Sequence, residues 1–175
     1  YPLDQDGIPG KAVTTIDEGK REAHCVLLPP DGKNIYVPYV KENLALLQYA
    51  YDSKTGKVTP LETKNAKPPL GSGPRHMAYH PPLPMVYFSN EQGIGLSSYH
   101  REINGELKVA QDINILPAGM SKIGLSASDL IITPDGKFLF AGLRGHSQDF
   151  NRISRYRILK DGRAEFIGLT KADRV

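Results

Sequence analysis

The stretch that decides the fold is RHMAYHPPLPMVYFSNEQ, residues 75–92. Two short apolar runs lie on either side of a proline-rich bend, while an Arg-His pair opens the stretch and an Asn-Glu pair closes it. Short runs of this kind, separated by turn-forming residues, are typical of a β-hairpin. A hairpin would bring the Arg-His pair and the Asn-Glu pair to the same end.

The same pattern occurs in two further places. AHCVLLPPDGKNIYVPYV (23–40) precedes this stretch and ASDLIITPDGKFLFAGLR (127–144) follows it. The copies align at a constant offset of 52 residues, and each continues into a strand-like segment and a glycine turn. The recurring positions are Pro30, Pro82 and Pro134; Tyr36, Phe88 and Phe140; and His24 and His76, with Ser128 in the third copy. Internal repeats of this period indicate a repeat architecture.

Each unit is predicted to form four short strands, which in the first copy cover 24–28, 34–40, 44–52 and 57–63. Pro-Asp-Gly turns between the first two strands suit hairpins. A repeated four-stranded meander is the signature of a β-propeller blade. A β-helix would need much shorter periods, and an immunoglobulin-like sandwich would not repeat. The sequence therefore predicts an all-β fold, a β-propeller of four-stranded antiparallel blades.

The 175 residues hold about three units of this size, whereas propellers close with roughly four to eight blades. We therefore expect residues 1–175 to form a partial propeller, with approximate blades at 23–72, 73–124 and 125–175. Uncovered blade faces would expose apolar side chains. For that reason we expect the chain either to self-associate or to belong to a longer protein.

Composition narrows the partners and the compartment. The 22 basic and 19 acidic residues are well mixed, which argues against a nucleic-acid or membrane partner. No apolar stretch approaches the roughly 18 residues of a membrane span. Cys25 is the single cysteine, which excludes an internal disulfide and is compatible with a cytoplasmic protein. The chain begins at Tyr1 without a methionine, as a trimmed chain would, so a lost leader stays open.

Strand polarity predicts a site. The start of the first strand and the end of the second share one face of a blade, which places Arg75 and His76 beside Asn90 and Glu91. By the same rule His24 and Arg144 lie at that face in the flanking blades. Arginine forks bind carboxylate or phosphate, and Glu and His transfer protons. The set suits a small anionic substrate.

These residues also show a family resemblance. GSGPRHMAYHP followed by VYFSNE, with AHCVLLPPDGKNIYV before it and ITPDGKFLFAGLRG after it, resembles the seven-bladed propeller lactonases. That family includes propeller-type 6-phosphogluconolactonases and fungal carboxy-cis,cis-muconate lactonizing enzymes. The resemblance covers roughly 20–175 and implies a catalytic set of His24, Arg75, Glu91 and Arg144. His76 and Asn90, which strand polarity places at the same face, are expected to contact substrate.

The resemblance implies an enzyme that hydrolyses 6-phosphoglucono-1,5-lactone. Glu91 or a histidine would activate water, while Arg75 or Arg144 would bind the phosphate or stabilise the oxyanion. Two alternatives stay open: a cycloisomerase that closes a carboxymuconate, and a non-catalytic propeller that serves as a scaffold for protein partners.

Structural roles for the same residues also stay open. His24 and His76 could satisfy backbone groups between blades, Arg75 could bracket two blades, and Glu91 could simply pair with an arginine. Cys25 is expected to pack inside a buried strand. His76 and His80 would lie about 13 Å apart on a strand, too far for one zinc ion. We therefore expect no metal and no organic cofactor.

Overall fold

The computed structural model describes residues 1–41, 44–116, 118–145 and 150–173. Within these ranges the chain contains no α-helix, and no helix could cross a membrane. The regular structure is entirely β, as predicted. The strands are β1 (Asn34–Tyr39), β2 (Ala45–Tyr51), β3 (Val58–Asn65), β4 (Pro74–Tyr79), β5 (Met85–Asn90), β6 (Gly95–Arg101), β7 (Leu107–Asn114), β8 (Leu125–Ile132), β9 (Phe138–Gly145), β10 (Arg152–Ile158) and β11 (Ala164–Lys171).

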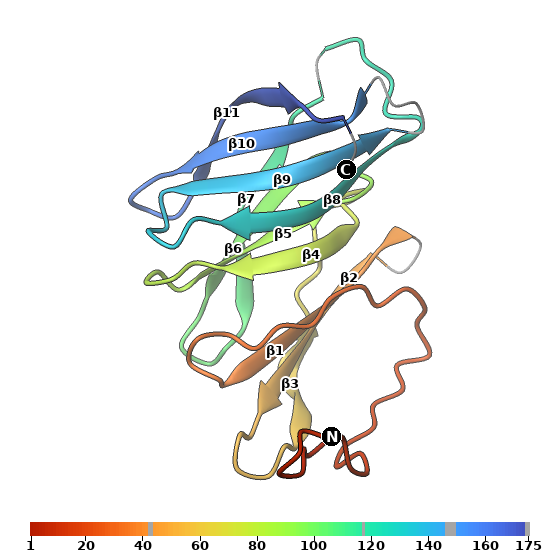
Figure 1. The fold of residues 1–175 in the computed structure, drawn as a ribbon, viewed down its shortest axis with the longest axis vertical. Coiled ribbons are helices and arrows are strands. Elements are labelled where there is room, and N and C mark those ends of the chain that lie inside the picture. Colours follow the sequence, from red (N-terminus) through yellow and green to blue (C-terminus); the bar gives the residue numbers. More distant parts are fainter. Residues whose placement is uncertain (42–43, 117, 146–149, 174–175) are drawn as a thin grey trace.

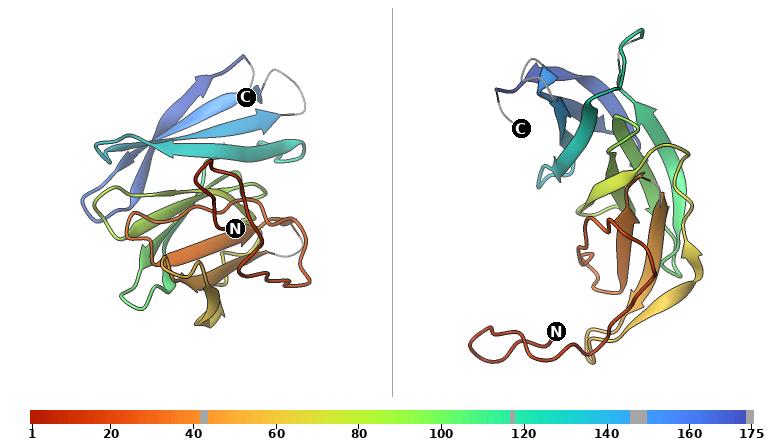
Figure 2. Two further views of the ribbon diagram at one scale, coloured as in Figure 1. Left: turned by 60° about the horizontal axis from the view of Figure 1, so that its bottom comes forward. Right: turned by 90° about the vertical axis from the view of Figure 1, so that its right-hand side faces the viewer.

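The strands form three antiparallel sheets in sequence order, β1-β2-β3, β4 to β7 and β8 to β11. One sheet follows another along the molecule, and together they make an arc (Figures 1 and 2). Neighbouring sheets approach each other at their first strands, where β1 lies near β4 and β4 beside β8. These strands lie on the concave side of the arc in Figure 2, and β3 and β7 on the convex side. The arrangement is a partial propeller.

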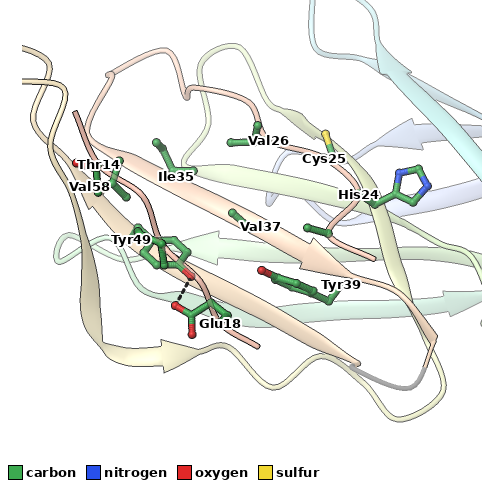
Figure 3. A pocket seen from close by; sticks show the side chains of 12 residues that line it. Thr14, Glu18, His24, Cys25, Val26, Ile35, Val37, Tyr39, Tyr49 and Val58 are labelled. Carbon is green, nitrogen blue, oxygen red and sulfur yellow. Dashed lines mark hydrogen bonds between the residues drawn. The ribbon is translucent and has the colours of Figure 1, made fainter. Parts of the chain in front are cut away.

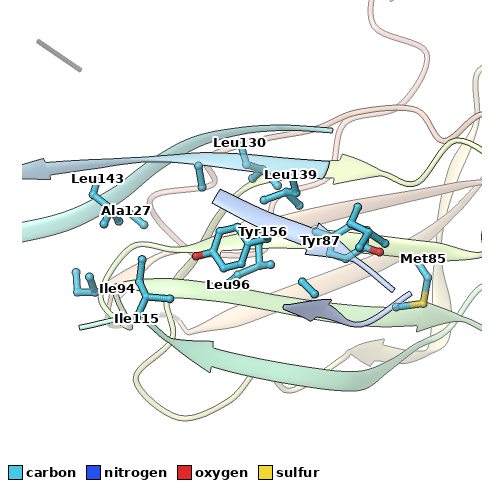
Figure 4. Close-up of a cluster of buried hydrophobic side chains, with 13 residues drawn as sticks. Met85, Tyr87, Ile94, Leu96, Ile115, Ala127, Leu130, Leu139, Leu143 and Tyr156 are labelled. Carbon is cyan, nitrogen blue, oxygen red and sulfur yellow. The ribbon is translucent and has the colours of Figure 1, made fainter. Parts of the chain in front are cut away.

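Apolar side chains fill the space between the sheets, and the central strands are therefore buried on both faces. All six residues of β5 are buried: Val86 and Phe88 pack toward the first sheet, whereas Met85 and Tyr87 pack toward the third. The larger cluster joins the second and third sheets (Figure 4). Alternation of two apolar faces along one strand is what a blade between two neighbours requires.

One tyrosine in each of the first two sheets forms a hydrogen bond to a turn of the next sheet. Tyr36 of β1 donates a 2.7 Å hydrogen bond to the carbonyl of Gly105, and Tyr87 of β5 does the same to Gly162. Gly162 has φ +81°, and a β-carbon there would lie 2.6 Å from the side chain of Met85. Only glycine therefore fits this turn, since it needs both a left-handed backbone and space for the adjacent blade.

The first sheet has three strands, so the strand predicted at 24–28 is wrong. Its described pairing with β1 is an isolated bridge just before the segment, Ala23 with Tyr39, and a hydrogen bond from the His24 amide to the Pro38 carbonyl. Pro38 has no N–H to return, and Pro29 and Pro30 remove two more donors, so the ladder stops. The segment instead exposes its apolar side chains, and Cys25 is only half-buried.

Candidate active site

A carboxylate lies between two arginines at one end of the second and third sheets. Arg75 is in β4, Glu91 follows the last residue of β5, and Arg144 is in β9. Arg75 Nε lies 3.4 Å from Glu91 Oε2, and Arg144 Nη2 lies 3.6 Å from Oε1 of the same carboxylate. The backbone fixes Glu91 as well, because its N–H donates to the Gly73 carbonyl and its own carbonyl accepts from Ala127. The structure thus brings these three residues together.

Both guanidinium groups keep a buried Nε without a well-formed hydrogen bond, since the contact of Arg75 Nε with Glu91 is a long ion pair. Nε of Arg75 and Nε of Arg144 are buried, and neither makes a hydrogen bond within the described chain. Buried polar atoms are nearly always hydrogen-bonded, so these two Nε–H groups remain available as donors. Burial and the neighbouring charge of Arg144 lower the pKa of Arg75, although an arginine with a lowered pKa still carries its charge at neutral pH.

The two predicted histidines lie beside this cluster. The rings of His24 and His76 have centroids 5.0 Å apart, and Nδ1 of His24 is buried without a hydrogen-bond partner in the described chain. Burial lowers the pKa of His24, and the positive charge of Arg75 lowers it further. The His24 imidazole is therefore neutral at pH 7, able to accept or donate one proton.

A cleft of about 470 Å³ opens in front of Glu91 and Arg144. Lys41 also lines it, a residue that the sequence analysis did not select, and its Nζ lies 2.8 Å from Glu22 Oε1. Lys41 comes after the end of β1, just as Glu91 comes after the end of β5. Its position in the repeat could therefore have identified Lys41 as a site residue. The other lining residues are Gln92, Gly124, Leu125, Ser126 and Gly145.

A second pocket, of about 580 Å³, lies between the N-terminal segment and the first sheet (Figure 3). Val26, Ile35 and Val37 line it, and the Tyr49 hydroxyl donates a 2.9 Å hydrogen bond to Glu18 within it. His24 stands at its edge. Although this pocket is the larger, its mostly apolar wall offers little for an anion, so the cleft at Glu91 is the better site for chemistry.

Asn90 does not join the cluster. Its side chain is buried, donates a 2.8 Å hydrogen bond to Asp112 and accepts a 3.0 Å bond from Ser97. These partners belong to the same sheet, so we leave Asn90 out of the proposed site. Among the described residues no group of three or more His, Cys, Asp or Glu side chains is placed to hold a metal ion.

Comparison with known proteins places the chain in a family. Residues 1–174 match the family described as "Lactonase, 7-bladed beta-propeller". A 6-phosphogluconolactonase of Cronobacter sakazakii is 33% identical over 138 residues, which are 78% of this chain and 40% of that protein. The 6-phosphogluconolactonase of Pectobacterium carotovorum subsp. carotovorum is 31% identical over 165 residues, 93% of this chain and 47% of that protein. The chain thus spans less than half the length of these curated relatives.

Solved structures agree in fold. A periplasmic gluconolactonase of Pseudomonas aeruginosa superposes with a TM-score of 0.75 at 25% identity, over 85% of this chain and 40% of its own. A crystal structure of a putative 6-phosphogluconolactonase from Bacteroides fragilis gives a TM-score of 0.77 at 20% identity, over 98% of this chain and 50% of its own, which supports the fold alone. With a family match over residues 1–174, this chain belongs to the seven-bladed β-propeller lactonase family.

Proposed function

We propose that the chain carries part of the active site of a sugar-lactone hydrolase that acts on 6-phosphoglucono-1,5-lactone. The observation that carries this proposal is the carboxylate of Glu91 between Arg75 and Arg144, beside an open cleft that Glu91 and Arg144 line. The relatives named 6-phosphogluconolactonase and the gluconolactonase structure support the substrate class.

The geometry suggests different roles for the two arginines. Arg144 lines the cleft and Arg75 does not. Arg144, together with Lys41, therefore supplies positive charge to the phosphate or to the oxyanion that forms when water attacks the lactone carbonyl. Arg75 has only 12% of its side chain exposed, so it acts behind Glu91 and holds that carboxylate in place. No metal is needed for these steps, because the charge is supplied by side chains.

The test is hydrolysis of 6-phosphoglucono-1,5-lactone by this chain, corrected for the spontaneous reaction and run beside a carboxymuconate. We expect lactone hydrolysis that survives excess EDTA, and an about 10²- to 10³-fold loss in Arg144→Ala, the scale for one transition-state donor. Arg157→Ala is the matched control, since that arginine is exposed on β10 and pairs with Glu165.

A direct binding measurement separates catalysis from recognition. The product 6-phosphogluconate should shift the NMR signals of the Arg144 guanidinium and of the Lys41 amide. A chain that neither hydrolyses the lactone nor binds this product would overturn the proposal. Turnover of the carboxymuconate instead of the lactone would show that the chain is a cycloisomerase. If neither compound is turned over and a protein partner binds equally well to Arg144→Ala, the chain would instead be a scaffold.

The cytoplasmic location predicted from the single cysteine also stays a proposal. The structural neighbour from Pseudomonas aeruginosa is periplasmic, so members of this fold are not confined to one compartment. Fractionation of cells that express the native gene would decide between the two locations.

A further inference from the structure

A histidine and an aspartate from neighbouring inner strands form a short hydrogen bond beside the arginine cluster. Nδ1 of His76, in β4, lies 2.7 Å from Oδ1 of Asp129, in β8. Asp129 plays no part in the site described so far. Its charge nonetheless acts on Arg75, where it favours the protonated guanidinium. The pair therefore shares the electrostatic environment of Arg75 and, through Arg75, that of Glu91.

The strands build this pair with two β-bulges. The β4–β5 register shifts between Pro74 and Met77, so Arg75 and His76 fall in the first bulge. The β8–β9 register shifts between Ala127 and Leu130, which places Asp129 in the second. A bulge puts an extra residue into one strand and re-aims its side chains, and bulges are enriched beside active sites.

Backbone contacts then hold both residues in place. The His76 N–H donates to Ser89 Oγ at 3.2 Å, and the Leu130 N–H donates to Asp129 Oδ1 at 2.9 Å. The same carboxylate oxygen therefore accepts from a backbone amide and from the imidazole. Asp129 remains largely exposed, with 79% of its side chain accessible, so the backbone amide and His76 rather than packing fix its orientation.

This hydrogen bond selects one form of the imidazole. A carboxylate at Nδ1 requires a proton there, so in the neutral ring Nε2 carries the lone pair. No hydrogen bond in the described chain engages Nε2 of His76, and this nitrogen is not among the buried unpaired atoms. It is therefore open to water or substrate.

The alternative bases are less well arranged. Glu91 has one guanidinium near each carboxylate oxygen, so both of its oxygens already face a positive partner. Burial and the charge of Arg75 lower the pKa of His24, which makes that imidazole a weaker base as well. His76 is the imidazole whose Nδ1 faces a carboxylate, the arrangement that fixes the tautomer and the orientation of the ring.

We propose that His76 is the general base of the lactonase reaction and that Asp129 is its positioning residue, an assignment that rests on the proposed function. His76 Nε2 takes a proton from water as the water oxygen bonds to the lactone carbonyl carbon and the carbonyl π electrons move to oxygen. When this oxyanion collapses, the ring C–O bond breaks. The proton then passes from the imidazolium to the departing alkoxide, which gives the hydroxy acid and restores the neutral histidine.

Asp129→Ala tests the dyad, with Asp135→Ala as control. Asp135 is an aspartate in the next turn that accepts from Thr133 and the Lys137 amide, and within the described chain it forms no ion pair or hydrogen bond with a histidine. At pH 8 the ¹⁵N signals of the His76 ring should report the Nδ1–H tautomer in the unmodified chain and in Asp135→Ala. We expect a shift toward Nε2–H in Asp129→Ala. In lactone hydrolysis, kcat should fall about 10- to 100-fold with KM unchanged, as for other partners that orient a histidine.

His76→Gln completes the experiment, with an expected loss of about 10²- to 10⁴-fold in kcat, the range for a general base. Full activity in His76→Gln, or an unchanged tautomer and kcat in Asp129→Ala, would overturn the dyad while leaving the lactonase proposal intact. If the unmodified chain does not hydrolyse the lactone, the proposed function is wrong, and so is the assignment of His76 as its general base. The tautomer measurement would still show whether Asp129 orients His76.

Discussion

Arg75 Nε lies 3.4 Å from Glu91 Oε2, although the two residues stand at opposite ends of the segment that forms the β4–β5 hairpin. The hairpin returns the chain to its starting edge, so sequence distance becomes spatial contact. Arg144 reaches the same carboxylate from the next sheet. The site therefore spans two blades, and its geometry depends on how those blades pack.

Replacing Glu91 by glutamine tests whether its charge organises the cleft. The amide would retain the size and hydrogen-bonding capacity of the side chain, but it would leave two close guanidinium groups without their shared anion. We expect lactone hydrolysis to fall about 10²-fold or more while the chain stays folded. Glu165→Gln, which breaks an exposed pair on β11, should leave activity unchanged. Wild-type kcat/KM in a folded Glu91→Gln variant would assign Glu91 a purely structural role.

The repeat explains how much of this fold could be predicted. Pro30, Pro82 and Pro134 set the period, and the three strands predicted after Pro30, at 34–40, 44–52 and 57–63, lie within two residues of β1, β2 and β3. The segment 24–28 failed because its partner strand contains Pro38, which cannot return a hydrogen bond. The sequence pattern indicates which residues are apolar, but it does not show whether the neighbouring strand can form the backbone hydrogen bonds of a regular ladder.

Asp129 was missed for a related reason. At the 52-residue offset it aligns with Met77 and Cys25, so the repeat pattern gives no sign of a polar site at this position. The bulge in β8 comes one residue later in the repeat than the bulge in β4, so Asp129 faces His76 instead. A bulge changes register without any distinctive residue type. The cluster of Arg75, Glu91 and Arg144, in contrast, followed from strand polarity alone, because polarity does not depend on local register.

The tyrosine ties between sheets should contribute measurable stability. Tyr87→Phe removes the hydroxyl that bonds to the Gly162 carbonyl and leaves that carbonyl unpaired at the interface. We expect a loss of about 1–2 kcal/mol in the free energy of unfolding, measured by urea denaturation. Tyr36→Phe should cost a similar amount, because Tyr36 makes the equivalent bond to Gly105.

Tyr51→Phe is the control for these variants. The Tyr51 side chain is half-buried and no hydrogen bond of its hydroxyl occurs in the described chain, so its removal should change stability by less than about 0.5 kcal/mol. Equal effects of Tyr51→Phe and Tyr87→Phe would show that the hydroxyl ties do not stabilise the interface.

Stability should fall as the solution is acidified below pH 6.5, in part because of His24. Burial and Arg75 lower the pKa of His24 from its ordinary value of 6.5. Above that value both the folded and the unfolded chain hold a neutral imidazole. As the pH falls through it, the unfolded chain takes up a proton that the folded chain resists, so the unfolding free energy decreases.

His24→Gln should therefore flatten the decline of Tm between pH 7 and pH 5. Some decline in Tm should remain, since burial also lowers the pKa of His80, whose ring is hydrogen-bonded to the Gly136 carbonyl. Parallel Tm profiles for the variant and the unmodified chain would contradict the electrostatic position given to His24.

The apolar surface of the first sheet should make the isolated chain associate. Val26 is 60% exposed and lines the 580 Å³ pocket together with Ile35 and Val37. In a propeller such a face lies against another blade, and monomers seldom expose apolar patches larger than a few hundred Å². We expect light scattering to give a mass that rises with concentration, with a two-fold dimer as the simplest closed form.

Val26→Lys should lower that mass, because a charge placed on the face opposes its burial. Ile103→Lys introduces the same charge at a fully exposed turn and should leave the mass unchanged. A monomeric mass for the unmodified chain across the whole concentration range would show that the N-terminal segment covers this face well enough by itself.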